Sequence, residues 1–81
     1  MKIYFSAKLV KDYAKVHPDI RKAFDQKIKF LEKDLRHPSL RAKKYDESVG
    51  VWQARVNQDY RFYFKIEGDI YKIIAITPHP K

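Results

Sequence analysis

The spacing of the apolar residues changes once along this chain, and this change constrains the fold more than any other feature. In the first half, apolar residues recur every three or four positions, as on one face of an amphipathic helix: Ile20, Phe24, Ile28, Leu31 and Leu35. In "VWQARVNQDYRFYFKI", residues 51–66, apolar and polar residues alternate, as in a half-buried strand. The first part of the chain is therefore predicted to be mainly helical, and the second part to form a sheet.

The first part is predicted to hold one strand and two helices. The run "KIYFS" is rich in strand formers, and the hydroxyl of Ser6 is suited to cap a helix that begins at Ala7. Pro18 disfavours the helical conformation at His17 and is itself suited to be the first residue of a second helix. Pro38 is expected to end the helical part, because proline cannot continue the backbone hydrogen bonds.

The second part is predicted to be a series of strands joined by tight turns. Residues 57–59 separate the two alternating strands, and residues 68–69, Gly-Asp, make another turn before the final strand "IYKIIAIT". Residues 41–50 are interpreted as a basic cluster followed by an acidic turn. A chain of 81 residues can bury one core. We therefore predict a single α+β domain, residues 1–81, with an N-terminal strand, a two-helix antiparallel hairpin and an antiparallel β meander packed against the helices.

Composition restricts the kinds of chemistry that the chain can support. Eighteen Lys and Arg against ten Asp and Glu give a formal net charge of +8, which favours nucleic acid, an acidic protein or an anionic membrane as partner. The chain has no cysteine, no His/Glu motif with zinc spacing and only two glycines, so we expect neither a metal nor a nucleotide cofactor. The first ten residues are too short and too charged for a signal peptide or a membrane span, so a cytoplasmic location is expected.

Simple alternation predicts a charged, aromatic face on the sheet. If Trp52, Phe62 and Phe64 face the helices, five other residues share the opposite face: Gln53, Arg55, Arg61, Tyr63 and Lys65. Arginine binds phosphate through forked hydrogen bonds and tyrosine stacks on unpaired bases, so this face suits single-stranded RNA. Lys43 and Lys44 are further candidates for phosphate contacts. The alternative is that these charges only keep a wetted sheet face soluble.

His79 is a candidate general acid, because Pro78 and Pro80 on either side restrict the backbone after the last strand. Cleavage of RNA without a metal needs an arginine to hold the phosphate, a group to activate the 2′-hydroxyl and an acid to protonate the leaving oxygen. This mechanism needs no type of residue that the chain lacks. A lone histidine near the end of a chain is also compatible with no function at all.

A pattern in the predicted hairpin resembles the RelE/ParE superfamily of toxins from bacterial and archaeal toxin–antitoxin pairs. The pattern is W-x-x-R-V-x-x-x-Y-R-x-x-F, formed by Trp52, Arg55, Val56, Tyr60, Arg61 and Phe64. The predicted order of strands and helices is similar to that of the family as well. The resemblance covers nearly the whole chain, and it implies a RelE-like toxin domain.

The resemblance to the RelE branch implies an endoribonuclease that cuts mRNA on the ribosome, inhibits translation, needs no metal and is silenced by an acidic antitoxin. Arg61 matches the arginine of the family's "YR" pair, Arg55 matches a basic residue on the preceding strand, and His79 matches the Arg or His after the last strand. These three are the implied catalytic residues. Gln53 lies where a lysine is frequent, and Lys43, Lys44, Tyr63 and Lys65 complete the expected RNA-binding set.

The chain also departs from the family pattern. Many members carry a tyrosine or a short helix after the last strand, whereas only Pro80 and Lys81 follow His79 here, so Tyr63 is the candidate substitute for stacking on the nucleotide. No general base is obvious, although Asp46 or Glu47 would serve if their loop folded inward. The departure leaves two alternatives open within this fold, a gyrase-inhibiting toxin of the ParE branch and an inactive RNA- or protein-binding module, and a generic single-strand RNA-binding protein as a third.

Overall fold

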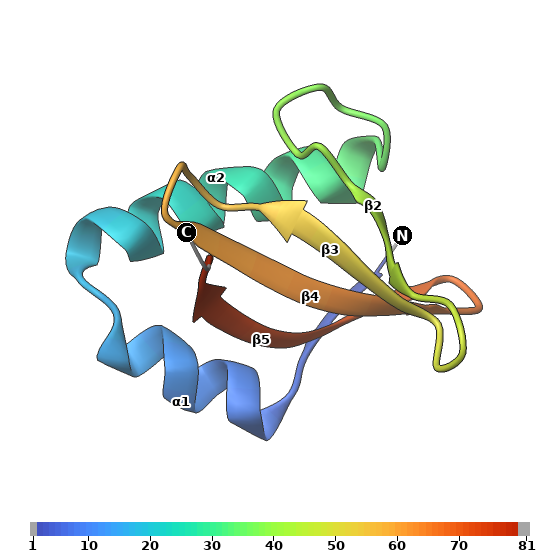
Figure 1. Ribbon diagram of the computed structural model, residues 1–81, viewed down its shortest axis with the longest axis horizontal. Helices are drawn as coiled ribbons and strands as arrows, with labels where there is room; N and C mark the ends of the chain where they lie inside the picture. The colour runs from blue at the N-terminus through green and yellow to red at the C-terminus, as the bar shows by residue number, and fades with distance from the viewer. Residues whose placement is uncertain (1, 80–81) are drawn as a thin grey trace.

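The computed structural model describes residues 2–79, which form two helices and one five-stranded sheet (Figure 1). In chain order the elements are β1 (Lys2–Phe5), α1 (Ala7–Lys15), α2 (Pro18–Lys33), β2 (Lys43–Asp46), β3 (Val51–Arg55), β4 (Tyr60–Glu67) and β5 (Ile70–Pro78). The strands are arranged in the order β1-β5-β4-β3-β2. The predicted α+β class and the predicted position of both helices before the main part of the sheet are confirmed.

The helix starts follow the residues that predicted them. Ser6 is the N-cap of α1, and its hydroxyl accepts a hydrogen bond from the backbone N–H of Leu9 at 3.0 Å. Pro18 is the first residue of α2, and the Nδ1 atom of His17 accepts the N–H of Asp19 at 3.2 Å. Both helices therefore begin where local side chains satisfy their free N–H groups.

The end of α2 differs from the prediction. The helix stops at Lys33, well before Pro38, so Leu35 does not continue the helical stripe as its spacing indicated. The physical reason is Asp34, whose backbone is extended and whose side chain accepts the N–H of Arg36 at 2.9 Å. A short aspartate side chain that bonds to the backbone two residues on competes with the helix. Leu35 still packs against the core.

The sheet is mixed, not antiparallel throughout as predicted. Strand β1 pairs parallel with β5, in the register Lys2↔Ile70 to Phe5↔Ile73, whereas β2, β3, β4 and β5 pair antiparallel in chain order. After β1 the chain leaves the sheet through two helices. A connection of this length allows a later strand, here β5, to lie parallel to β1. Strand β5 has a neighbour on both sides, which agrees with its apolar residues on both faces.

Strand β2 is absent from the elements that the sequence predicts, because the pattern of residues 41–50 indicates a basic cluster and a turn. All four residues of β2 are exposed, and the strand pairs with β3 along one edge of the sheet. Its sequence "KKYD" has no apolar alternation, so the pairing with β3 is what makes it a strand.

One face of the sheet and the two helices enclose the core. The ring of Phe24 in α2 meets Phe62 in β4 edge to face, with centroids 5.4 Å apart, and Phe64 lies beside Phe62. Phe62 and Phe64 are fully buried. Helix α1 is tied to the second half of β5, where Ser6 Oγ donates to the carbonyl of Ile74 at 2.8 Å and Asp12 accepts the N–H of Ile76 at 3.1 Å. These bonds hold the end of β5 in place. The buried residues of both helices belong to one core with Phe62 and Phe64, so the helices pack on this one face of the sheet.

Neither helix in residues 2–79 has the length and apolar character that a membrane crossing requires.

Candidate functional site

The sheet face opposite the helices carries the charged and aromatic residues that the alternation predicted. Trp52 pairs with Phe64 and Ala54 pairs with Phe62 on the helix side of the sheet. The residues between them in the two strands point to the opposite side, which we call the open face. The open face comprises Lys43, Gln53, Arg55, Arg61, Tyr63 and Lys65, from three neighbouring strands.

Arg55 and Arg61 lie directly opposite one another in the β3–β4 pairing. The Cβ atoms of such a pair are about 5 Å apart, and like-charged residues directly opposite one another destabilise the pairing. Arg61 is held by its Nη1 atom, which donates to the carbonyl oxygens of Asn57 at 2.7 Å and Tyr60 at 3.0 Å. Both arginines are partly exposed. This end of the sheet therefore carries two positive side chains, which a bound anion would stabilise.

His79 lies at the same end of the sheet. Its backbone N–H donates to the carbonyl of Asp59, in the turn between β3 and β4, at 2.7 Å. Two residues earlier, Thr77 pairs with Arg61. Figure 1 shows the end of β5 beside the start of β4 and the β3–β4 turn. The side chain of His79 is exposed, so the structure brings this residue near the arginine pair and leaves its imidazole accessible to a ligand.

The centre of the open face is aromatic. Tyr63 accepts a hydrogen bond at its hydroxyl from Gln53 Nε2 at 3.1 Å, and its ring meets that of Tyr45 with centroids 5.0 Å apart. Gln53 is only 7% exposed, so it supports Tyr63 from below and offers little surface to RNA. Tyr45 is 61% exposed. Tyr45 is not among the site residues predicted from the sequence, because its segment has no strand period.

The two neighbouring lysines of β2 point to opposite faces of the sheet. Lys43 pairs with Gln53 on the open face, whereas Lys44 pairs with Trp52, and its Nζ atom lies 6.0 Å from the centroid of the Trp52 ring. Trp52 belongs to the helix side of the sheet, so Lys44 points away from the open face. Lys65 lies on the open face beyond Tyr63.

Asp46 and Glu47 do not approach the arginine pair. Asp46 pairs with Val51, at the opposite end of β3 from Arg55, and the four residue steps from Val51 to Arg55 span about 14 Å. The Asp46 carboxylate accepts hydrogen bonds from the hydroxyl of Ser48 at 2.6 Å and from its N–H at 3.1 Å, and these bonds lower the pKa of Asp46. The expectation that this loop folds inward to supply a general base is therefore wrong.

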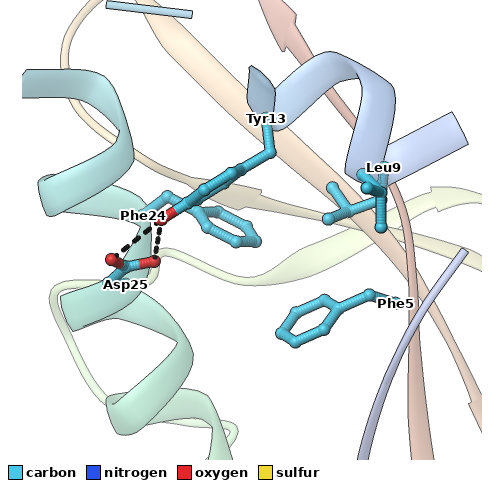
Figure 2. A pocket seen from close by; sticks show the side chains of 6 residues that line it. Phe5, Leu9, Tyr13, Phe24 and Asp25 are labelled. Carbon is cyan, nitrogen blue, oxygen red and sulfur yellow. Dashed lines mark hydrogen bonds between the residues drawn. The ribbon is translucent and has the colours of Figure 1, made fainter. Parts of the chain in front are cut away.

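A separate apolar groove lies on the helix side of the molecule, between α1, α2 and β1 (Figure 2). It has a volume of about 210 Å³ and is lined by Phe5, Leu9, Val10, Tyr13, Phe24 and Asp25. Tyr13 spans the groove, and its hydroxyl donates to both carboxylate oxygens of Asp25 at 3.0 Å. Burial, together with this hydrogen bond, raises the pKa of Tyr13. Phe5 and Val10 are 43% and 57% exposed at the rim, so the groove presents apolar surface to solvent.

In the part of the chain that the structure describes, no three His, Asp or Glu side chains are grouped so that they would hold a metal ion.

Known proteins resemble this chain in structure and not detectably in sequence. No family model matches the sequence, and no curated protein matches it either. Among solved structures, the YoeB/ParE toxin from Agrobacterium tumefaciens is similar with a TM-score of 0.82 and 15% identity, over 99% of this chain and 100% of that one. The archaeal RelE-RelB complex from Pyrococcus horikoshii OT3 gives a TM-score of 0.79 and 17% identity, over 95% and 92% of the two chains. A YoeB-YefM toxin-antitoxin complex from Staphylococcus aureus gives a TM-score of 0.77 and 18% identity, over 99% and 98%. The chain therefore has the fold of the RelE/ParE superfamily of toxins, as its hairpin pattern indicated.

Proposed function

We propose that this protein is the toxin of a toxin–antitoxin pair and acts as a metal-independent endonuclease on mRNA bound to the ribosome. The observation that carries the proposal is the arrangement at one end of the sheet, where Arg55 lies opposite Arg61 and the backbone of His79 bonds to the adjoining turn. The similarity to solved structures of YoeB and RelE toxins supports the same proposal.

In this mechanism the two arginines bind the scissile phosphate. Arg61 is oriented by its bonds to two backbone carbonyls, and among the described residues its Nε and Nη2 atoms form no hydrogen bond, so they are available to phosphate oxygens. The 2′-hydroxyl oxygen attacks phosphorus and gives its proton to a water molecule. Negative charge grows on the phosphate oxygens, and the guanidinium groups of Arg55 and Arg61 stabilise it. The bond to the 5′-oxygen breaks, and the protonated imidazole of His79 gives that oxygen a proton.

The rest of the open face would hold the nucleotide. The exposed ring of Tyr45 and the ring of Tyr63 form a surface on which a base would stack, and the Gln53 hydrogen bond orients Tyr63. Lys43 and Lys65 lie on either side of this aromatic pair and would contact phosphates of the same strand.

The proposed partner is an acidic antitoxin, and the proposed location is the cytoplasm, where mRNA is translated. A formal net charge of +8 attracts an acidic protein, and the apolar groove of Figure 2 suits the apolar side of an amphipathic segment. Solved structures with this fold include complexes between a toxin and its antitoxin.

Substitution of Arg61 tests the proposed activity. Cells that express Arg61→Ala are expected to grow, and primer extension on their mRNA is expected to lose the breaks that the unchanged protein produces, since phosphate binding in the transition state is lost. A single such group is worth about 10²–10³ in rate. Arg36→Ala, which removes an exposed arginine outside the open face, is the matched control and should stay toxic.

Circular dichroism must show that Arg61→Ala is folded, because the substitution also removes two hydrogen bonds to the β3–β4 turn. A folded Arg61→Ala protein that still cuts mRNA would overturn the mechanism. Growth arrest with DNA-damage signalling and without breaks in mRNA would instead identify a gyrase-inhibiting toxin with the same fold.

A further inference from the structure

A second concave surface adjoins the arginine pair on the side where β3 meets α2. It is shallow, with a volume of about 500 Å³. Its charged lining consists of Lys27 from α2, Arg41 from the loop before β2 and Arg55 from the end of β3. Ser39, Asn57 and Gln58 supply polar groups around them, and no acidic residue lines it. We call this surface the basic pocket.

The three cations of the basic pocket are not neutralised by the protein. The ion pairs among residues 2–79 are Lys8–Asp12 and His17–Asp19, neither of which involves the pocket. Lys27 is partly buried, and burial together with the nearby charge of Arg55 lowers its pKa. Three like charges held together without a counter-ion raise the free energy of the folded protein, and a bound anion would remove this cost.

The loop that carries Arg41 is held in a strained conformation. Arg41 has a φ of 46°, the only positive value at a non-glycine residue in the described part of the chain. The residue before it, Leu40, is fully buried, and its carbonyl accepts the N–H of Arg55 at 2.7 Å. The loop is therefore anchored to β3 beside the pocket. A left-handed conformation is strained for arginine, and such residues cluster at binding sites.

We infer that the basic pocket binds a phosphodiester of single-stranded RNA, adjacent to the phosphate held by Arg61. Two guanidinium groups match the oxygens of a phosphate through paired hydrogen bonds, and the hydroxyl and amide groups at the pocket add donors. Arg55 belongs both to the pocket and to the pair with Arg61, so a strand that crosses the open face can place its next phosphates at this rim. The inference rests on the proposed function, because it takes RNA as the ligand of the open face.

The test compares two lysines of α2 that differ in position and not in charge. Lys27 lines the basic pocket, whereas Lys29 is exposed elsewhere on the helix. The probe is a fluorescent 2′-O-methyl RNA oligonucleotide, which lacks the attacking hydroxyl and cannot be cut, and binding is measured by anisotropy over a salt series. For Lys27→Gln we expect about tenfold weaker binding and a salt slope smaller by about 0.7, as for one lost phosphate contact. Lys29→Gln should bind within about twofold of the unchanged protein.

Arg41→Gly provides a second variant that should not unfold. Glycine adopts a positive φ without strain, so we expect an unchanged or higher melting temperature together with about tenfold weaker RNA binding. Equal losses for Lys27→Gln and Lys29→Gln would overturn the inference, because they would show only a general effect of charge.

Two further probes identify the ligand. A glutamate-rich peptide of the same length should not distinguish Lys27→Gln from Lys29→Gln, and inorganic phosphate should compete with the oligonucleotide only at much higher concentration. If Lys27→Gln loses peptide binding and keeps RNA binding, the pocket belongs to an acidic protein and the inference is overturned. If inorganic phosphate competes as well as the oligonucleotide does, the pocket takes free phosphate and the inference is also overturned. Cleavage of mRNA on ribosomes is measured in a separate assay. If the protein binds the probe at this pocket and cuts no mRNA, the proposed nuclease activity is refuted and the pocket is not.

Discussion

At the scale of single residues, neighbours in sequence have unrelated roles once the strands pair. Lys43 and Lys44 lie on opposite sides of β2, and Gln53 is buried beneath Tyr63 although its position in β3 marks it as a surface residue. Tyr45, which has no distinguishing sequence signal, forms an exposed aromatic pair with Tyr63. The residues available to a ligand are thus a different set from those that alternation alone selects.

Removal of the Tyr45 ring tests its proposed role in base stacking. Tyr45→Ala is expected to weaken binding of an RNA oligonucleotide by about 1–3 kcal/mol, and Tyr45→Phe to retain binding because the ring is kept. The measurement compares an intact oligonucleotide with one that lacks the base at a single position, and Tyr45→Ala should abolish the difference between them.

Tyr4→Ala is the control for Tyr45→Ala, because Tyr4 is 55% exposed at the opposite edge of the sheet. If Tyr45→Ala and Tyr4→Ala bind the intact oligonucleotide equally well, the aromatic pair does not hold a base.

At the scale of elements, a few polar contacts tie the helices to each other and to the sheet. The Tyr13–Asp25 hydrogen bonds join α1 to α2, and Asp12 joins α1 to β5. The rings of Tyr13 and Phe24, 5.8 Å apart, pack beneath the first of these contacts. Figure 2 shows the Tyr13–Asp25 contact among the residues that line the groove.

The pKa of Tyr13 makes this helix–helix contact sensitive to alkaline pH. Because the folded protein raises the pKa above the ordinary value of 10.0, the stabilising contribution is complete below pH 10 and is lost as pH rises through the raised value. Thermal melting should therefore show a steeper loss of stability above pH 10 for the unchanged protein than for Tyr13→Phe. Tyr71, whose pKa burial also raises, is present in both proteins and cancels in the comparison. Parallel curves for the two proteins would show that the Tyr13 contact does not contribute.

At the scale of the whole molecule, the proposed catalytic face and the apolar groove lie on opposite sides of the sheet. The open face is turned away from the helices, whereas the groove lies between α1, α2 and β1. A partner segment bound in the groove would therefore leave the arginine pair to be covered by another part of the same partner. Toxicity and neutralisation are expected to depend on different residues.

A substitution in the groove tests this separation. Val10→Asp, at a rim residue that is 57% exposed, should leave toxicity unchanged and reduce rescue by an antitoxin, because a charge would be buried against an apolar segment. Co-expression growth assays with the antitoxin measure both effects. Val49→Asp is the matched control, at a residue 53% exposed outside the groove, and should be rescued fully. Full rescue of Val10→Asp would exclude the groove as an antitoxin contact.

The sequence alone determined the features that depend on neighbouring residues. Ser6 and Pro18 mark the two helix starts because capping acts within a few residues, and alternation places Arg55, Arg61, Tyr63 and Lys65 on one face because side chains alternate along any strand. The pattern around Trp52 also indicated the correct fold.

Only the tertiary structure decided the features that depend on partners distant in sequence. The direction of β1, the existence of β2 and the burial of Gln53 follow from strands whose pairing has no local signal. The basic pocket is the clearest case, because Lys27, Arg41 and Arg55 come from a helix, a loop and a strand. Local sequence sets which way a side chain points along its own element, but the packing of elements decides which charges meet.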